Sequence, residues 1–358
     1  AYTELIHNNE ANVTKLINSI DKSDITIDYL TLVKAKEKNL TIEDEKVLIK
    51  ELTNIGLKKE FLEKISPRNI FVANEIVSRY NFEGNITEKE KMVLIKSILN
   101  NSNLNRSYYL STLMQNLKSI GLSEQEIYGS IINLSINNRS TTTRGFSYTR
   151  LLDTSNKIEE LKKSKKEIET KVKCSTIDKA LVDNMEEHEI EELVQFYKSI
   201  GIEEKIIIEK DIENLYMIKK VVEEYSRKEK ITEEERKVIF QNMIDNKSLN
   251  NGESGKILRL IQGFEKIGLS RDEIYGTIIN LGIKGYATPI TGYDYNRLLS
   301  NSKKILELEK YKSLIETKID RTTLEKICFD SHAEKINEID LISEYEKLGI
   351  EREFIDCK

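Results

Sequence analysis

The stretch SIGLSEQEIYGSIINLSI, residues 119–136, returns as KIGLSRDEIYGTIINLGI at residues 266–283. The match continues without a gap through IETKV and IETKI, which end at Val172 and Ile319, with roughly 30 identities over about 54 positions. A match of this length and identity is typical of an internal duplication. The sequence therefore predicts tandem units of about 147 residues each.

Weaker matches extend the duplication in both directions. TNIGLKKEFLEK around Gly56 matches SIGIEEKIIIEK around Gly201, and about two extra residues near Asn251 shift the offset there to about 145. KLGIEREFIDCK around Gly349 begins the same element a third time. The predicted organisation is a helical lead-in at residues 1–26, repeat unit 1 at 27–172, repeat unit 2 at 173–319, and the start of a third unit or a C-terminal cap at 320–358.

Helix boundary signals recur within each unit. Gly121 stands where a helix would end in a left-handed cap, and Ser123 with Glu126 forms a capping box for the next helix. Equivalent boxes are predicted elsewhere in the chain: Thr87 with Glu90, Thr232 with Glu235, and Ser270 with Glu273. Apolar residues follow these boxes at helical spacing, so the units are built from helix-turn-helix elements.

The composition favours an all-α fold. Only Pro67 and Pro289 interrupt the chain, while 39% of residues are hydrophobic and 33% are charged. That balance is too apolar for a disordered chain and too polar for one compact, deeply buried core. We therefore expect tandem helical repeat units stacked as an α-solenoid-like or elongated multi-helix array.

A glycine lies within an otherwise apolar helix in both copies. Gly129 follows Tyr128, and Gly276 follows Tyr275. Glycine inside a helix costs about 1 kcal/mol relative to alanine. Its presence in both copies predicts the close approach of another helix or chain segment.

Charge and cysteine content narrow the classes of partner and compartment. The net charge of −5 is the difference between 61 acidic and 56 basic residues mixed along the chain, which does not favour nucleic acid as a partner. No apolar run is long enough to span a membrane. Three widely spaced cysteines, with no CxxC pair, favour a reducing compartment, either the cytoplasm or a host cytosol after translocation.

A search for catalytic, cofactor and metal motifs yields weak candidates. His332 stands four residues after Cys328, a spacing that places both on one helix face, but a single pair of this kind is more often incidental than nucleophilic. The sequence GESG at residues 252–255 lacks the spacing of a phosphate-binding loop. The acidic cluster at residues 186–192 lacks the loop of a calcium site. We predict no catalytic residues, cofactor or metal, and an enzyme is the less favoured class.

Each unit contains one long polar segment, INNRSTTTRGFSYTRLL in the first copy and IKGYATPITGYDYNRLL in the second. Loops on rigid scaffolds often carry binding residues, and Tyr and Arg are enriched at interface hot spots. The candidate partner-binding residues are Arg144, Phe146, Tyr148, Arg150, Tyr286, Tyr293, Tyr295 and Arg297. The alternative is structural: the glycine turns the chain, the aromatic pair packs on the following helix, and the arginine binds helix-end carbonyls.

Three hypotheses for function remain at this point. The leading one is a non-enzymatic helical-repeat scaffold that binds another protein, and a specific version is a host-directed factor of a host-associated microbe with an AT-rich genome. The second is an enzyme or small-ligand binder with a site between the repeat units. The third is a self-assembling structural module, since units that pack within a chain can also pack between chains.

Overall fold

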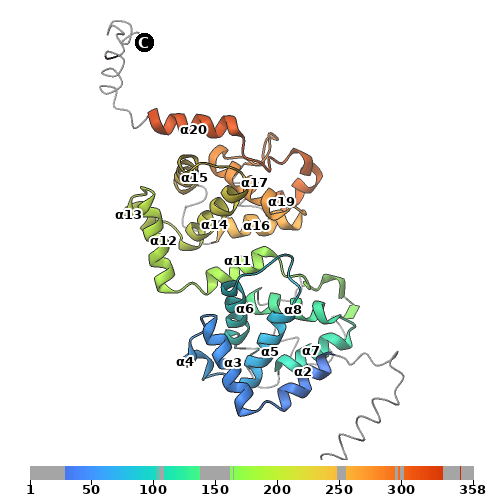
Figure 1. Ribbon diagram of the computed structural model, residues 1–358. Coiled ribbons are helices and arrows are strands. Elements are labelled where there is room, and N and C mark those ends of the chain that lie inside the picture. Colours follow the sequence, from blue (N-terminus) through green and yellow to red (C-terminus); the bar gives the residue numbers. More distant parts are fainter. Residues whose placement is uncertain are drawn as a thin grey trace, which may run out of the picture. The chain divides into compact units, whose positions relative to one another are not determined.

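The computed structural model is all-helical over the part of the chain that it describes (Figure 1). The described residues are 29–102, 104, 109–137, 162–163, 165–247, 255–294, 297–298, 302–333 and 347. Within these ranges there is no strand, and an isolated antiparallel bridge pairs Tyr286 with Asp294. The prediction of an all-α protein is confirmed. No helix in the described ranges is both long and apolar enough to cross a lipid bilayer.

The chain divides into two compact units, Ala1–Val172 and Lys173–Lys358. The described helices of unit 1 are α2 (Tyr29–Lys38), α3 (Ile42–Asn54), α4 (Lys59–Leu62), α5 (Pro67–Arg79), α6 (Glu88–Asn100), α7 (Tyr109–Ser119), α8 (Glu124–Asn137) and the short 3-10 helix η1 (Lys165–Glu167). Those of unit 2 are α11 (Cys174–Asp183), α12 (Glu187–Ser199), α13 (Glu204–Ile208), α14 (Ile212–Lys228), α15 (Glu233–Asp245), α16 (Lys256–Lys266), α17 (Arg271–Lys284), α19 (Ser302–Glu307), η2 (Leu308–Leu314) and α20 (Arg321–Ala333).

The predicted capping boxes are present. The Glu90 amide donates to the Thr87 hydroxyl (3.1 Å), and the Thr87 amide donates to the Glu90 carboxylate (2.8 Å), which fixes the start of α6. Equivalent reciprocal bonds begin α15, α17 and α8. Such a cap contributes about 1 kcal/mol, because it satisfies amides that have no partner within the helix. Gly121 and Gly268 adopt the expected left-handed conformation.

A central helix in each unit organises the core. In unit 1, α5 packs on α6, α7 and α8, and in unit 2, α14 packs on α15, α16 and α17. Leu215, Ile218 and Val222, on the inner side of α14, are fully buried. At about 1.5–3 kcal/mol per fully buried aliphatic side chain, this apolar packing is the main stabilising contribution in each unit.

An extended segment closes each unit and is held by a tyrosine and an asparagine. In unit 1, the Val172 amide donates to the Tyr80 hydroxyl (2.9 Å), and the Asn133 side-chain amide donates to the carbonyls of Glu169 and Lys171 (2.7 and 2.9 Å). In unit 2, the same contacts are made by Tyr225 with Ile319 (3.0 Å) and by Asn280 with Glu316 and Lys318 (both 2.7 Å). The backbone amides and carbonyls of these segments thus form hydrogen bonds with side chains, and not with a neighbouring strand.

The glycine in the adjoining helix explains how these segments come so close. A Cβ atom added at Gly129 would lie 1.7 Å from the Thr170 carbonyl oxygen, and one at Gly276 would lie 1.9 Å from the Thr317 carbonyl oxygen. No other residue fits there, because backbone atoms cannot move aside as a flexible side chain can. The predicted close approach is confirmed, and the approaching element is a chain segment instead of a helix.

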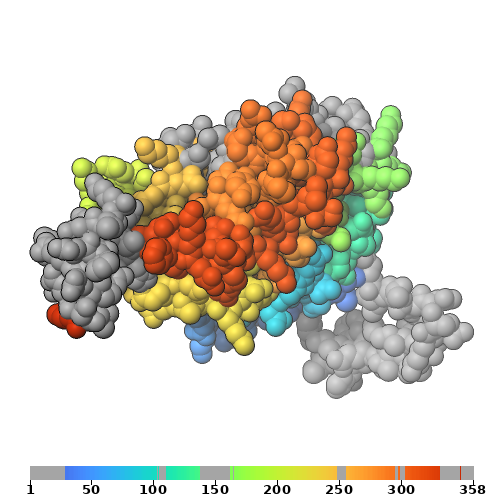
Figure 2. Space-filling view, turned by 90° about the horizontal axis from the view of Figure 1, so that it is seen from above, coloured from blue at the N-terminus to red at the C-terminus, as the bar shows by residue number. Residues whose placement is uncertain are grey.

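α20 is the last helix of unit 2 among those that the structure describes, and it lies on the surface of the unit (Figure 2). It packs on α15 and α17, and its Leu324 side chain is fully buried. Arg321 anchors the start of the helix through an ion pair with Glu235 (2.9 Å) and a hydrogen bond to the Lys230 carbonyl (3.3 Å). One side of α20 is therefore fixed to unit 2.

Candidate functional site

Three of the eight candidate partner-binding residues lie in the described part of the chain, and all three are in unit 2. They are Tyr286, Tyr293 and Arg297. The other five, Arg144, Phe146, Tyr148, Arg150 and Tyr295, lie outside the described residues, as do the extra residues near Asn251.

The segment that follows α17 forms a pinned turn. α17 ends at Gly285, whose positive φ of 81° terminates the helix, and Tyr286 then pairs with Asp294 across the turn. The Ala287 amide donates to the Tyr293 carbonyl (3.4 Å), and the Ala287 carbonyl accepts from the Glu316 amide (3.0 Å). The turn is therefore fixed to the segment that closes unit 2.

Tyr293 has a structural position within this turn. Its side chain is 7% exposed, and its ring packs edge-on against Tyr311, with the centroids 6.1 Å apart. Its hydroxyl lies 3.5 Å from the Glu307 carboxylate, and the Lys304 ammonium lies 5.8 Å from the ring centroid. Burial and the Glu307 charge raise the pKa of the Tyr293 phenol. Tyr293 thus attaches the turn to α19 and η2.

Tyr286 and Arg297 have solvent-accessible side chains. Tyr286 is 40% exposed, with the Lys284 ammonium 5.7 Å from its ring centroid. The Arg297 side chain is 64% exposed and forms an ion pair with Asp294 (3.5 Å). These two residues are available to a partner, whereas Tyr293 presents little surface to one.

Next to this turn, α19 and η2 expose large apolar side chains. Leu306 is 47% exposed, Tyr311 is 40% exposed and Leu314 is 47% exposed. Together with Tyr286 they are called the unit 2 apolar surface. Contiguous exposed apolar patches of more than a few hundred Å² mark interaction sites, whereas isolated exposed apolar residues need no explanation.

Unit 1 has polar residues at the matching positions of its sequence. Leu306, Tyr311, Leu314 and Tyr286 align with Glu159, Ser164, Glu167 and Arg139, respectively. Of these four, Glu167 lies in the described part of the chain, and it is exposed on η1. The apolar surface therefore belongs to one copy of the duplication, and residues that the shared fold requires would not differ in this way.

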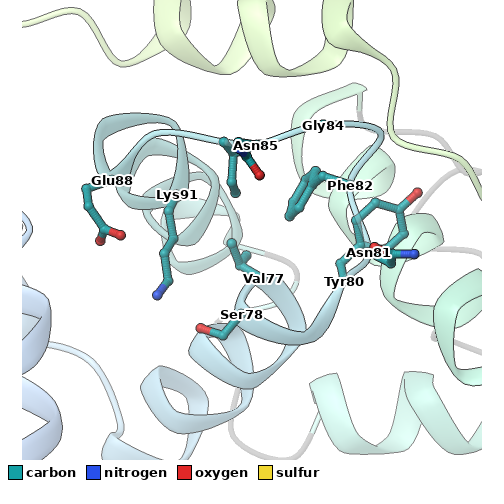
Figure 3. Close-up of a pocket in the computed structure, with 10 residues that line it drawn as sticks. Val77, Ser78, Tyr80, Asn81, Phe82, Gly84, Asn85, Glu88 and Lys91 are labelled. Atoms are coloured by element: carbon teal, nitrogen blue, oxygen red, sulfur yellow. The ribbon is translucent and has the colours of Figure 1, made fainter.

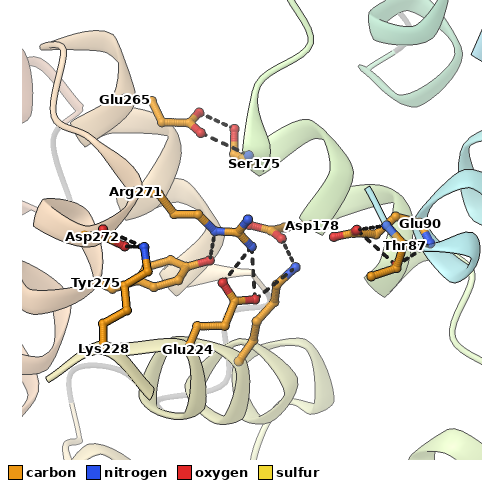
Figure 4. Close-up of polar contacts among 11 residues, drawn as sticks. Thr87, Glu90, Ser175, Asp178, Glu224, Lys228, Glu265, Arg271, Asp272 and Tyr275 are labelled. Atoms are coloured by element: carbon orange, nitrogen blue, oxygen red, sulfur yellow. Dashed lines mark hydrogen bonds and ion pairs between the residues drawn. The ribbon is translucent and has the colours of Figure 1, made fainter. Parts of the chain in front are cut away.

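A second candidate site is a cluster of charged residues beneath α11 (Figure 4). Asp178 of α11, whose side chain is 1% exposed, forms an ion pair with Lys220 of α14. Glu224, one turn further along α14, accepts hydrogen bonds from Arg271 of α17 (3.0 Å), and Arg271 also donates to the Tyr275 hydroxyl (2.9 Å). Charges of alternating sign thus connect three helices.

Glu265 completes this cluster at the start of α11. Its carboxylate accepts from the Ser175 amide (3.0 Å) and the Ser175 hydroxyl (2.5 Å). Because the first amides of a helix have no partner within it, Glu265 acts as a cap supplied by α16. Burial raises the pKa of both Glu265 and Glu224. The cluster pairs its charges internally, so we interpret it as an interface between helices.

The corresponding residues of unit 1 carry opposite charges. Lys220, Glu224, Glu265 and Arg271 align with Glu75, Arg79, Lys118 and Glu124, respectively. In unit 1 the Tyr29 hydroxyl of α2 donates to Glu75, Arg79 forms an ion pair with Glu75 (2.8 Å), and the Arg79 guanidinium lies 3.9 Å from the Tyr29 ring centroid. Both units thus hold this helix with polar contacts, but the charges at the matching positions have opposite sign.

An open pocket of about 550 Å³ lies beside the loop between α5 and α6 (Figure 3). Its lining residues are Val77, Ser78, Tyr80, Asn81, Phe82, Gly84, Asn85, Ile86, Glu88 and Lys91. Tyr80 and Phe82 pack edge to face, with centroids 4.8 Å apart, and the Tyr80 hydroxyl already accepts a hydrogen bond from the Val172 amide. Glu88 and Lys91 are the only charged side chains that line the pocket, so it does not concentrate charge around a ligand.

The weak catalytic and metal candidates have structural positions. Glu186 and Glu189 form the capping box of α12, and within the described residues no group of three or more His, Cys, Asp or Glu side chains is arranged to hold a metal ion. Burial raises the pKa of the Cys174 and Cys328 thiols, which disfavours the reactive thiolate. Cys328 and His332 both lie in α20, and the His332 side chain is outside the described residues.

Comparisons with known proteins leave the chain without an identified relative, since no family model, no curated protein sequence and no solved structure matches it.

Proposed function

We propose that this chain is a non-enzymatic helical-repeat scaffold that binds another protein through the unit 2 apolar surface. The observation that carries the proposal is the difference between the two copies. Leu306, Tyr311 and Leu314 are exposed in unit 2 at positions where unit 1 has Glu159, Ser164 and Glu167.

The repeat arrangement is part of this proposal. The same closing contacts occur in both units, through Tyr80 and Tyr225, through Asn133 and Asn280, and around the helix glycines. Units with the same internal contacts present similar surfaces and can stack as an α-solenoid-like array. A duplication also leaves one copy free to change, which is how a surface specific to one unit can arise.

The energetic argument favours a protein as the partner. Burying an apolar side chain of this size contributes about 1.5–3 kcal/mol, and here the exposed halves of four such residues are available. Tyrosine is enriched at hot spots because its ring covers a large area at little cost in conformational entropy. Tyr286 and Tyr311 are the expected anchors, with Leu306 and Leu314 beside them.

Charges next to the surface indicate the polarity of the partner. Lys304, Lys310 and Lys312 lie within the same segment as Leu306, Tyr311 and Leu314. The Lys312 ammonium donates to the Gly268 carbonyl (2.5 Å) and interacts with the Glu273 carboxylate, and Lys304 pairs with Glu307 (2.9 Å). The segment is positively charged overall because residues 303–312 contain four lysines and two glutamates. We expect the matching surface of the partner to combine apolar side chains with carboxylates, which would also accelerate association.

The test replaces the apolar surface of unit 2 with the residues of unit 1. Proteins cross-linked to the intact chain are identified, purified, and measured for affinity to a variant with Leu306→Glu, Tyr311→Ser and Leu314→Glu. The expected result is a loss of affinity of at least about 100-fold, corresponding to roughly 2.7 kcal/mol. Circular dichroism and thermal unfolding establish that the variant is folded.

A matched control is Ile208→Glu, since Ile208 is 72% exposed on α13 and lies outside the unit 2 apolar surface. This variant should bind the partner with unchanged affinity. A folded triple variant that binds as tightly as the intact chain, or an equal loss caused by Ile208→Glu, would reject the proposed surface.

A further inference from the structure

Three helices occupy the same place in the duplicated sequence. Tyr29 at the start of α2, Cys174 at the start of α11 and Arg321 at the start of α20 are aligned with one another. α11 and α20 each follow directly on the segment that closes a unit. α20 therefore corresponds in sequence to α2 and α11, the first described helices of units 1 and 2, which are called first helices below.

The first helix of each unit packs on the body of that unit. α2 contacts α5 and α7, and α11 contacts the corresponding α14 and α16. The side chains that are buried at matching positions are Leu30, Val33 and Glu37 in α2 and Ser175, Asp178 and Val182 in α11. These three positions define the docking face of a first helix.

The docking face of α20 is uncovered. Its three residues are Thr322, Glu325 and Phe329, and all three are exposed, with Phe329 at 73%. The other side of α20 is attached to α15 and α17 through Leu324, as described above. Figure 2 shows this helix at the molecular surface, in red-orange. An exposed phenylalanine on a helix that is anchored on its opposite side indicates a docking surface.

The chemistry of this face matches α11 and differs from α2. Thr322 corresponds to Ser175, and Glu325 corresponds to Asp178, which is paired with Lys220 in unit 2. In α2 the matching residues are apolar, and the position of Lys220 is taken by Glu75. A carboxylate at position 325 would be paired on a surface with the charges of unit 2 and repelled on one with the charges of unit 1.

We propose that the outward face of α20 binds a third helical body, next along the same chain, that has the charge arrangement of unit 2. α20 then serves that body as α11 serves unit 2: Glu325 pairs with a lysine at the position of Lys220, and Phe329 enters the site that Val182 fills. This inference rests on the repeat arrangement put forward under the proposed function, but not on the unit 2 apolar surface or its partner.

The test supplies such a body. Residues 331–358 are replaced by a second copy of residues 184–319, which places the body of unit 2 directly after residues 321–330, the part of α20 that aligns with α11. The amides of residues 321–330 should then exchange with solvent at least about tenfold more slowly than in the original chain, because covering a helix suppresses its local opening. Phe329→Asp should abolish this protection.

The chain itself provides the matched control. When residues 331–358 are replaced instead by residues 39–172, the body of unit 1, Glu325 faces Glu75 and the exchange of α20 should stay as in the original chain. A variant of that control with Thr322→Leu, Glu325→Val and Phe329→Glu carries the docking face of α2, and it should recover the protection. Equal protection by the two bodies would contradict the proposed selectivity.

Two further outcomes decide against the proposal. In the first outcome, the added body of unit 2 folds when it carries its own α11 and is joined by a flexible linker, but it does not fold when α20 replaces α11. This result would show that α20 cannot act as a first helix. Protection of α20 in the original chain that increases with protein concentration assigns its outward face to a second copy of the chain. Loss of partner binding by the triple variant at the unit 2 apolar surface would leave all of these results unchanged.

Discussion

The two units fix their closing segments with the same residues and their first helices with different ones. Tyr80 and Tyr225 make the same bond to the closing segment, as do Asn133 and Asn280. At the first helix, by contrast, four charged positions have reversed sign between the units. The closing segments are held through their backbone groups, whose chemistry cannot change, whereas most contacts at the first helices join two side chains, which can change together.

The largest effect is expected from giving unit 2 the charge of unit 1 at one position. Lys220→Glu leaves the Asp178 carboxylate buried against a second carboxylate, and breaking a buried pair in this way costs about 3–5 kcal/mol. Adding Asp178→Val, the residue that α2 has there, should recover most of that loss. Chemical unfolding monitored by hydrogen exchange in each unit measures both values, and a tolerated Lys220→Glu would show that the pair is unimportant.

Substitutions of the helix glycines test the contact between helix and closing segment that the two units share. Gly129→Ala and Gly276→Ala both place a Cβ atom within 2 Å of a backbone carbonyl oxygen, so each should destabilise its own unit by about 3 kcal/mol. Gly282→Ala is the comparison, because its Cβ would meet a side-chain atom, Met243 Cγ at 2.6 Å, instead of a backbone carbonyl, and should cost less. A loss confined to one of the two units would contradict the equivalence of their closing segments.

The hydroxyls of the half-buried Tyr80 and the buried Tyr225 test the same equivalence with a smaller expected effect. Tyr80→Phe and Tyr225→Phe each leave one backbone amide, of Val172 or Ile319, without its acceptor. We expect a loss of about 1–2 kcal/mol in the free energy of unfolding of each unit, and equal losses within error. Exchange of the two amides should become faster in the respective variant.

The smallest effect concerns pH. Hydrogen bonds from Ser123 and Ser270 lower the pKa of Glu126 and Glu273. A carboxyl group with a lowered pKa in the folded state contributes stability above its unfolded pKa, and this stability is lost as the pH falls through the folded pKa. Glu126→Gln and Glu273→Gln should therefore reduce the decline in stability below about pH 4.5 by similar small amounts, as acid titration of thermal unfolding would show.

Local sequence signals predicted much of the fold. The capping boxes at Thr87, Thr232 and Ser270 are present because a cap depends on residues three positions apart. Gly129 and Gly276 indicated a close approach correctly, since an isolated glycine in a helix needs a local cause. The sequence could not identify Thr170 and Thr317 as the approaching residues, because that contact depends on tertiary packing.

The candidate partner-binding residues stay a prediction. Most of them are retained between the copies, and Tyr293, one of these, is buried against Tyr311. Leu306, Tyr311 and Leu314, which form the proposed surface, were not among the candidates, although the alignment places them opposite Glu159, Ser164 and Glu167. Apolar residues at positions that are polar in the other copy were the available signal. The reversed charges around Lys220 were missed as well, since their proximity requires the folded helices.

Site-specific photo-cross-linking tests the central claim most directly. A photoreactive amino acid is placed at position 314 of unit 2 in one chain and at the matching position 167 of unit 1 in another, since both residues are exposed. The account predicts that one purified partner is cross-linked from position 314, that excess unmodified chain competes with this reaction, and that position 167 gives no product. Equal cross-linking from both positions, or none from position 314 to a partner that binds the chain, would contradict it.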